Sequence, residues 1–301
     1  MTRRDITLIA VLSLIWGASF MLIKVAGRAF DPFALALALV LVRLALACAV
    51  LVPLAFVKVG RGALTHSIDA WRALVLLGLV NTAAPFVLIS WAETRIDSSL
   101  AAILQAAAPI FGAVIGIRFG HDRVAGRRLL GVFVGFAGVA LLVGAPGKGG
   151  IVAALAVVLA ALGYACGASF GSYLTGGFDP LVVGAASTVA ATVMVAPIGL
   201  WRLPTAAPGW KEWVSVGVLG LVGTGLAYVF LFALLRSAGP SRSILITYLI
   251  PGIALLYGVL LLGEPLRLAA VGGLVLILLG VALASGMRRV SGGRTRRPST
   301  E

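Results

Sequence analysis

Runs of about 20 apolar residues recur along the whole chain, and they constrain its fold more than any other feature. A helix of about 20 residues is the length that crosses the hydrocarbon core of a bilayer. The chain is 61% hydrophobic and 11% charged, whereas roughly 25% of residues are charged in soluble domains. We therefore predict an all-α polytopic membrane protein. Its ten spans are expected at 6–27, 33–57, 71–92, 98–118, 127–144, 150–173, 180–200, 212–235, 242–262 and 267–286.

Two short words occur in the first half of the chain and return, in the same order, in the second half. Gly17-Ala18-Ser19-Phe20 returns as Gly167-Ala168-Ser169-Phe170, and Phe30-Asp31-Pro32 returns as Phe178-Asp179-Pro180. The glycine-serine word predicts a place where helices pack closely, because small residues let helix backbones approach each other in membranes. Further residues match at a constant spacing of 142: Thr82 with Thr224, Phe86 with Tyr228, Pro109 with Pro251, and Gly138 with Gly280.

The matches divide the ten spans into two units of five. A unit of five spans begins on one side of the membrane and ends on the other, so its copy must run inverted. Inverted repeats are typical of secondary transporters, whose substrate site lies near the midplane between the halves. We predict a first repeat over 1–145 and a second over 146–287, arranged around a central cavity. A disordered basic cytoplasmic tail is expected over 288–301.

The positions of the lysines and arginines predict the orientation. If the N-terminus is cytoplasmic, most of them fall in inner loops and in the tail, as the positive-inside rule requires. We expect a multi-pass protein of the cytoplasmic (inner) membrane with both termini inside. The net charge of +14 does not indicate nucleic-acid binding, because the charges form no basic face with interleaved aromatic residues.

Metal, cofactor and enzymatic sites are not indicated. Cys48 and Cys166 lie in apolar runs without CxxC spacing, and His66 and His121 fall in expected inner loops. No histidine or pair of carboxylates lies within a span, so an intramembrane enzyme has no triad or metal cluster to use.

Three segments carry a family resemblance: LIWGASFMLIKVA at 14–26, VRLALA at 42–47 and LIPGIALLYGVLLLGEPL at 249–266. With the duplicated spans, the chain resembles the EamA-type transporters of the drug/metabolite transporter superfamily over about 6–286. The resemblance implies two EamA domains, a basket of helices around a cavity, and movement of small metabolites, often amino acids and commonly outward. Where the second half has Gly263-Glu264-Pro265, the first has His121-Asp122-Arg123, so a shared role for this corner is expected to be structural.

Arg43 is the cation nearest the middle of a span. An unpaired arginine there costs at least about 2.5–3.5 kcal/mol on insertion scales, so it should face the bundle interior or a wet cavity. It could attract a substrate carboxylate or phosphate, or it could be a structural cation bonded to backbone carbonyls. Lys24 lies near the outer end of span one, where its stem can reach the interface.

Polar and aromatic residues inside the spans complete the candidate site. Asn81 and Gln105 could bond substrate or a neighbouring helix, and the aromatic residues suggest a cavity with apolar walls. The candidate substrate-binding residues are Trp16, Arg43, Asn81, Phe86, Gln105, Tyr164, Tyr228, Thr247 and Tyr248.

Pro109 and Pro251 lie at matching positions inside spans four and nine. Proline removes a backbone donor and kinks a helix, so this pair is expected to shape the cavity or act as hinges. None of the ten acidic residues lies in the middle of a span. Glu93, at the outer end of span three, is the nearest candidate for coupling to protons, and a facilitator driven by the substrate gradient is the alternative.

These observations predict a secondary transporter of small organic metabolites, and an exporter of amino acids or related zwitterionic or anionic compounds in particular. Alternating access between the two halves is the expected mechanism. The alternative within transport is a flippase for lipids or lipid-linked sugars. The expected partners are a small-molecule substrate and membrane lipid.

Overall fold

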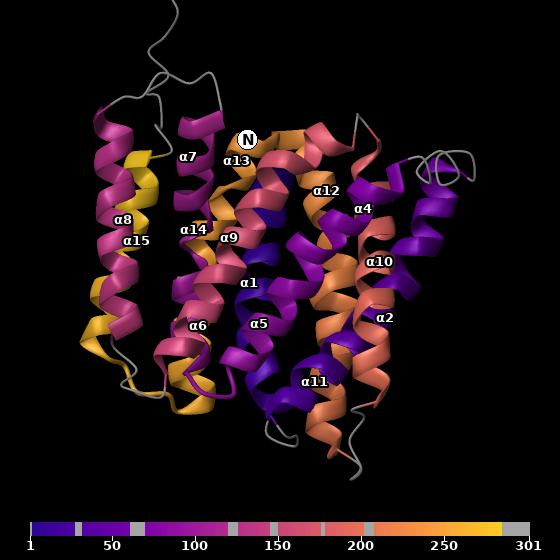
Figure 1. Cartoon of the computed structure of the whole chain (residues 1–301), viewed down its shortest axis with the longest axis horizontal. Helices are drawn as coiled ribbons and strands as arrows, with labels where there is room; N and C mark the ends of the chain where they lie inside the picture. The colour runs from indigo at the N-terminus through magenta and orange to yellow at the C-terminus, as the bar shows by residue number, and fades with distance from the viewer. Residues whose placement is uncertain are drawn as a thin grey trace, which may run out of the picture.

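The computed structural model describes residues 2–27, 32–60, 70–119, 126–144, 150–175, 178–201 and 208–284. Throughout these ranges the regular elements are helices, which run up and down between two opposite faces of the molecule (Figure 1). The all-α prediction is confirmed. The expected tail at 288–301, both histidines, and Phe30 and Asp31 of the first repeated word lie outside the described residues.

The first half holds five membrane-length segments, two of them divided into shorter elements. They are α1 (Arg3–Ala26); α2 (Pro32–Val59); α4 (Trp71–Gly78), the π-helix η3 (Leu79–Ala83) and α5 (Ala84–Ala92); α6 (Ser98–Gln105) and α7 (Ala108–Phe119); and α8 (Gly126–Gly144).

The second half follows the same plan. Its elements are α9 (Ile151–Leu174); α10 (Pro180–Trp201); α11 (Trp210–Gly220), the π-helix η4 (Leu221–Leu226) and α12 (Ala227–Ala238); α13 (Pro240–Ser243) and α14 (Leu245–Leu262); and α15 (Leu268–Ala284).

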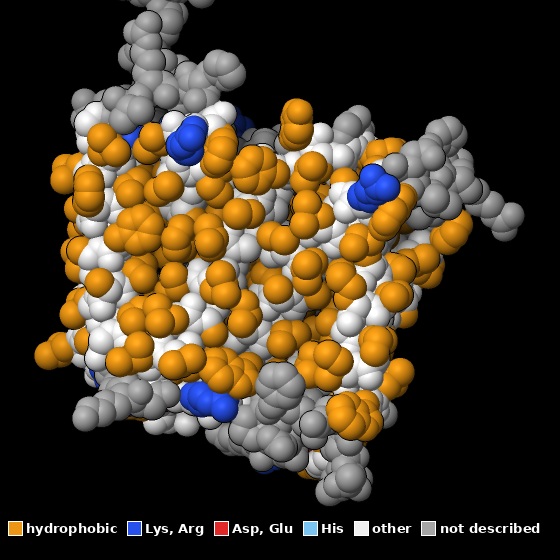
Figure 2. All heavy atoms as spheres, viewed as in Figure 1, with side chains coloured by type: hydrophobic (Ala, Val, Ile, Leu, Met, Phe, Trp, Pro, Cys, Tyr) orange, Lys and Arg blue, Asp and Glu red, His pale blue; other side chains and the backbone are white. Residues whose placement is uncertain are grey.

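Nine segments of the described chain are long and apolar enough to cross a membrane, and α15 is a shorter apolar helix. At 17 residues, α15 still rises about 25 Å and lies within the usual range for a span. Large apolar side chains such as Val57, Leu260 and Leu268 are exposed, as lipid-facing residues are. Figure 2 shows apolar side chains across the middle of one face and basic ones near its upper and lower borders.

Contacts between the halves occur in exchanged pairs, which is what a twofold relation between inverted repeats produces. The first helix α1 packs on α14, as its counterpart α9 packs on α6 and α7. It also packs on α11 and α12, as α9 packs on α5. Similarly, α2 contacts η4 where α10 contacts η3, and the equivalent pairs α2–α10 and α8–α15 contact each other. The predicted fold of two inverted five-helix repeats is confirmed.

The repeated glycines lie at close contacts between the halves. A methyl group at Gly17 would lie 2.6 Å from Cγ2 of Ile253 in α14, and one at Gly167 would overlap Asn81 of η3. Each glycine therefore lets the first helix of its own half touch the other half, as expected for closely packed helices. This duplicated contact accounts for the duplicated word.

Irregular backbone is concentrated in the middle of the spans. The two π-helices occupy equivalent places, with Thr82 in η3 and Thr224 in η4. The fourth span breaks at residues 106–107, just before Pro109. In the second half, α14 continues through Pro251 without a break. Pro251 lies in the second turn of α14, where it removes the hydrogen bond to the Thr247 carbonyl and its ring crowds that oxygen.

Candidate functional site

A cavity of about 630 Å³ lies between the two halves, within the usual size range of small-molecule sites. It begins near Ile23, toward the end of α1, and reaches Thr175, at the end of α9, and Ser243, just before α14. Helix α1 starts at the N-terminal face, whereas α9 ends there and α14 starts there. The cavity therefore extends to the N-terminal face and stops short of the opposite one.

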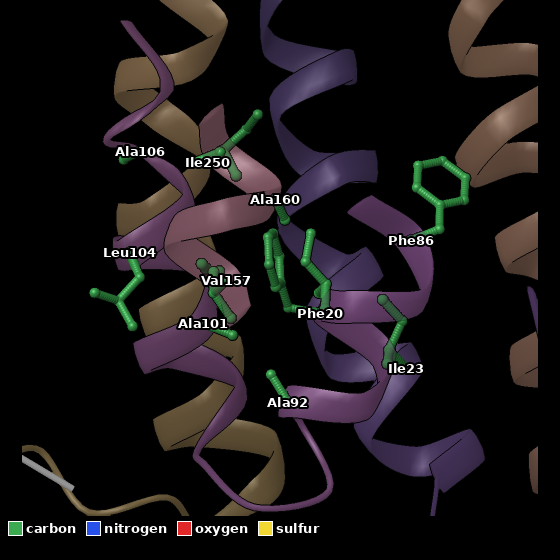
Figure 3. Packing of buried hydrophobic residues seen from close by; sticks show 14 of the residues in the cluster. Phe20, Ile23, Phe86, Ala92, Ala101, Leu104, Ala106, Val157, Ala160 and Ile250 are labelled. Atoms are coloured by element: carbon green, nitrogen blue, oxygen red, sulfur yellow. The ribbon is translucent and has the colours of Figure 1, made fainter. Parts of the chain in front are cut away.

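Buried apolar residues close the cavity on the side opposite the N-terminus. Phe20, Ile23 and Phe86 line the cavity and also belong to the largest buried cluster. Figure 3 shows this cluster between α1, α5, α6, α9 and α14, with Ala92 at the lower end of the labelled residues. Among the described residues, this buried apolar packing therefore lies between the cavity and that face.

Arg43 on α2 supplies the positive charge of the cavity, and it is only 5% exposed. Its Nε donates a hydrogen bond to Oγ1 of Thr224 at 2.8 Å, and its Cζ lies 3.9 Å from the centre of the Phe86 ring. Across the described residues this is the only hydrogen bond of the guanidinium. Its two Nη groups are therefore the donors left for a ligand, and a guanidinium fork pairs well with a carboxylate.

The π-helix η4 explains how Thr224 reaches Arg43. The Thr224 hydroxyl donates to the Leu219 carbonyl five residues earlier, at 3.0 Å, and accepts from Arg43. The indole Nε1 of Trp16 donates to the Gly223 carbonyl at 3.1 Å, which ties α1 to the same irregular turn. Irregular backbone of this kind is tolerated at membrane depth where it lines a cavity.

Most of the predicted site residues come together in this cavity. Tyr248 does not line it, because Thr247 faces the cavity and the next residue on a helix points about 100° away. Glu93 does not line it either. A binding role for those that do line it stays a prediction: Trp16, Arg43, Asn81, Phe86, Gln105, Pro109, Tyr164, Tyr228, Thr247 and Pro251.

Sequence reasoning missed part of the α1 surface. Ser19, Phe20 and Ile23 line the cavity together with Trp16. They follow Trp16 by three, four and seven residues, a spacing that places all three on the same face of the helix as Trp16 and that was the signal available in the sequence. Ser19 also contributes to packing: its hydroxyl donates to the Ile15 carbonyl at 3.1 Å.

No acidic side chain occurs among the described residues that line the cavity, and Arg43 is their only charged member. Lys24 lies beyond the cavity end, where its Nζ donates to the carbonyls of Glu93 and Ile96 at 2.7 and 2.8 Å. A zwitterion or anion entering the cavity would therefore meet one fixed cation among amide, hydroxyl and aromatic groups.

The two inverted halves and the cavity between them define a multi-pass membrane transporter of the inverted-repeat class. Comparison with known proteins identifies its family. The EamA-like transporter family matches residues 4–144 and again 151–286. The chain belongs to the EamA-like transporter family, whose members are transporters rather than enzymes.

Three relatives cover most of this chain. It is 28% identical to the uncharacterized inner membrane transporter YedA of Escherichia coli strain K12, over 85% of this chain and 82% of YedA. It is 24% identical to an uncharacterized transporter of Archaeoglobus fulgidus, over 88% of this chain and 93% of that protein. It is 29% identical to a probable terminal-alkyne amino-acid exporter of Streptantibioticus cattleyicolor, over 75% of this chain and 76% of that protein.

A solved crystal structure has the same fold. The two chains superpose with a TM-score of 0.66 at 19% sequence identity. The superposition covers 94% of this chain and 97% of the chain in the crystal structure. At that identity the likeness concerns the arrangement of the helices alone.

Proposed function

We propose that this transporter exports amino acids or related zwitterionic or anionic metabolites across the cytoplasmic (inner) membrane by alternating access. The observation that carries the proposal is Arg43: it is the one charged side chain among the described residues lining the cavity. A buried guanidinium with free Nη donors favours a carboxylate and disfavours a purely cationic cargo. The similarity to a probable amino-acid exporter supports the same class of cargo.

The rest of the lining suits the other parts of an amino acid. The aromatic rings of Trp16, Tyr164 and Tyr228 can pack against an apolar side chain and attract an ammonium group through their faces. The amides of Asn81 and Gln105 offer both donors and acceptors. In this proposal Arg43 fixes the carboxylate end of the cargo and these groups set its size and polarity.

The direction of opening fits export. We place both termini in the cytoplasm, because that orientation puts most lysines and arginines inside. The cavity then opens toward the cytoplasm, which is the loading state of an exporter. Movement of repeat 1–145 against repeat 146–287 would expose the same cavity to the other side.

Transport by reconstituted protein tests the proposal. Liposomes containing the wild-type protein and a pool of labelled neutral amino acids should show protein-dependent flux. Arg43→Ala should reduce this flux about 10- to 100-fold at low substrate concentration, because a hydrogen bond to a charged group contributes about 1.5–3 kcal/mol. Arg43→Lys should recover only part of it, because lysine lacks the planar fork.

Arg95→Ala is the matched control, since Arg95 is exposed and stacks on Trp91 at the face opposite the N-terminus. It should transport like wild type. Unchanged amino-acid flux in a well-folded Arg43→Ala variant would reject the assignment of Arg43. Flipping of a fluorescent lipid without amino-acid flux would favour the flippase alternative.

A further inference from the structure

Glu93 is a buried carboxyl group that accepts no hydrogen bond within the described part of the chain. It follows α5 directly, at the face opposite the N-terminus, and is only 1% exposed. Among the described residues neither of its carboxyl oxygens has a hydrogen-bond partner. Burying an ionised carboxylate in this way is so unfavourable that such a group normally takes up a proton instead.

The charged neighbours of Glu93 come from three other elements. Lys24 of α1 is the nearest cation, but the described bonds of its Nζ go to the carbonyls of Glu93 and Ile96. Glu264, between α14 and α15, is a second acid close enough to act on Glu93, and Arg43 of α2 acts from the cavity side. Glu93 therefore meets one cation already bound to backbone, one competing carboxylate and one more remote cation.

Glu264 has the partners that Glu93 lacks. Its two carboxyl oxygens accept hydrogen bonds from the backbone N–H groups of Ser98 and Ser99, at 2.7 and 3.0 Å. These groups form the N-terminus of α6, where a negative charge is favoured. Burial alone would raise the pKa of Glu264, but hydrogen bonding by Ser99 and Ser98 outweighs it and lowers the pKa. Glu264 therefore holds the negative charge.

The balance at Glu93 is the reverse. Burial, the dominant cause, raises the pKa of Glu93 well above its usual range. Lys24 opposes this shift, while the charge on Glu264 adds to it. Together with its burial and the absence of a hydrogen-bond partner among the described residues, this shift favours the protonated form of Glu93 in the closed arrangement.

The same region holds the two halves together at this face. Glu264 belongs to the second half, and the serines it binds belong to the first. Arg267 of the second half pairs with Asp97 of the first, with 3.6 Å between Nη2 and Oδ2. Opening this face requires these contacts to separate, and that separation would let water reach Glu93 beside them.

We propose that Glu93 is a proton-binding site that controls whether the cavity opens at the face opposite the N-terminus. Proton uptake from water by the carboxylate accompanies closure of this face, and release of that proton accompanies its opening. The site thus links proton occupancy to the side on which the cavity is accessible. The inference that these contacts form a proton-dependent gate is argued from the contacts themselves. The use of this gate to drive export rests on the proposed function.

The sign of the pH dependence follows from linkage. In this proposal the closed state has the higher pKa at Glu93, so between the two pKa values it binds up to one proton more than the open state. Closure is therefore favoured at low pH and is lost as the pH rises through the pKa of the closed state. For one proton, the closed-to-open ratio changes up to about tenfold per pH unit between the two pKa values.

Distance measurements on substrate-free protein test the gate. Spin labels at Arg95→Cys in the first half and Leu268→Cys in the second report the separation across this face, after replacement of Cys48 and Cys166. Both labelled positions are exposed. Electron–electron double resonance in nanodiscs should show a population with a longer distance that grows as the pH rises.

The variant Glu93→Gln should remain at the short distance at every pH, because glutamine mimics the protonated acid in size and charge. Glu93→Asp should keep a pH response, since it can still titrate. Glu212→Gln, a partly exposed acid on the first turn of α11, is the matched control and should behave like wild type.

A wild-type pH response in Glu93→Gln would overturn the inference, as would a wild-type distance that does not change with pH. Different results would reject the proton site at Glu93 and the proposed export of amino acids. The distance change needs no cargo, so it would survive an error in the substrate class, and flux that depends on Arg43 would survive the loss of the proton site.

Discussion

At the scale of single residues, the site depends on how one threonine holds one arginine. Thr224 is fully buried, and its hydroxyl is the described hydrogen-bond acceptor for Nε of Arg43. We expect Thr224→Val to leave this donor unpaired and the guanidinium poorly oriented. The substrate concentration for half-maximal transport should rise about tenfold, since an unsatisfied buried donor costs about 1–3 kcal/mol.

Concentration-dependent uptake into liposomes measures this effect. Thr224→Ser is the control, because it keeps the hydroxyl and should stay close to wild type. If the valine and serine variants share the same half-saturation concentration, Thr224 does not position Arg43.

The sequence predicted only some of the side chains that line the cavity. Arg43 could be found because a charge inside an apolar run has few acceptable surroundings other than an interior cavity. Tyr248 was selected for its chemistry alone, although the phase of the helix turns it away from Thr247. Ser19 was interpreted as a packing residue, and the structure shows that one side chain can pack and also line a cavity.

At the scale of elements, α8 and α15 form a pair beside the cavity helices (Figure 1). Neither helix contributes a described residue to the cavity lining. Their backbones meet at glycines: a methyl group at Gly280 would lie 2.5 Å from the backbone nitrogen of Gly135. Because that neighbour is backbone, it cannot move aside cheaply.

We therefore expect Gly280→Ala to destabilise the protein by about 1–3 kcal/mol, the usual cost of overpacking. A thermal-unfolding assay in detergent measures the change as a lower midpoint. Gly272→Ala is the matched control on the same helix, since its methyl group would lie 3.7 Å from Leu141, an ordinary contact. Equal midpoints for the two variants would contradict this account of the interface.

The positions of the spans were predictable because hydrophobic length alone defines them. The irregular elements within them were not. No local signal distinguishes the π-helices η3 and η4 from ordinary helix, since they depend on tertiary partners such as Trp16 and Arg43. The matched prolines do not give matched helix boundaries: the fourth span breaks next to Pro109, whereas α14 continues through Pro251. A second pair of prolines, Pro53 and Pro197, lies inside the continuous helices α2 and α10.

At the scale of the whole molecule, the repeated words and the odd number of spans were sufficient to predict the inverted halves. The sequence could not show which face is closed, because that depends on contacts between distant segments. The structure supplies them: Asp97 and Arg267 are 170 positions apart and pair across the halves at the face opposite the N-terminus. This pair offers a direct test of alternating access.

In the variant carrying Asp97→Cys and Arg267→Cys without the native cysteines, a short reducible crosslinker should bridge the two thiols. Holding this face closed leaves the cavity open on one side only, so cargo can bind but cannot leave on the other side. Net flux in liposomes should fall to the protein-free level and return when dithiothreitol cleaves the crosslinker. Each single-cysteine variant, treated in the same way, should keep its flux. Full flux through completely crosslinked protein would mean that the two halves do not separate here during transport.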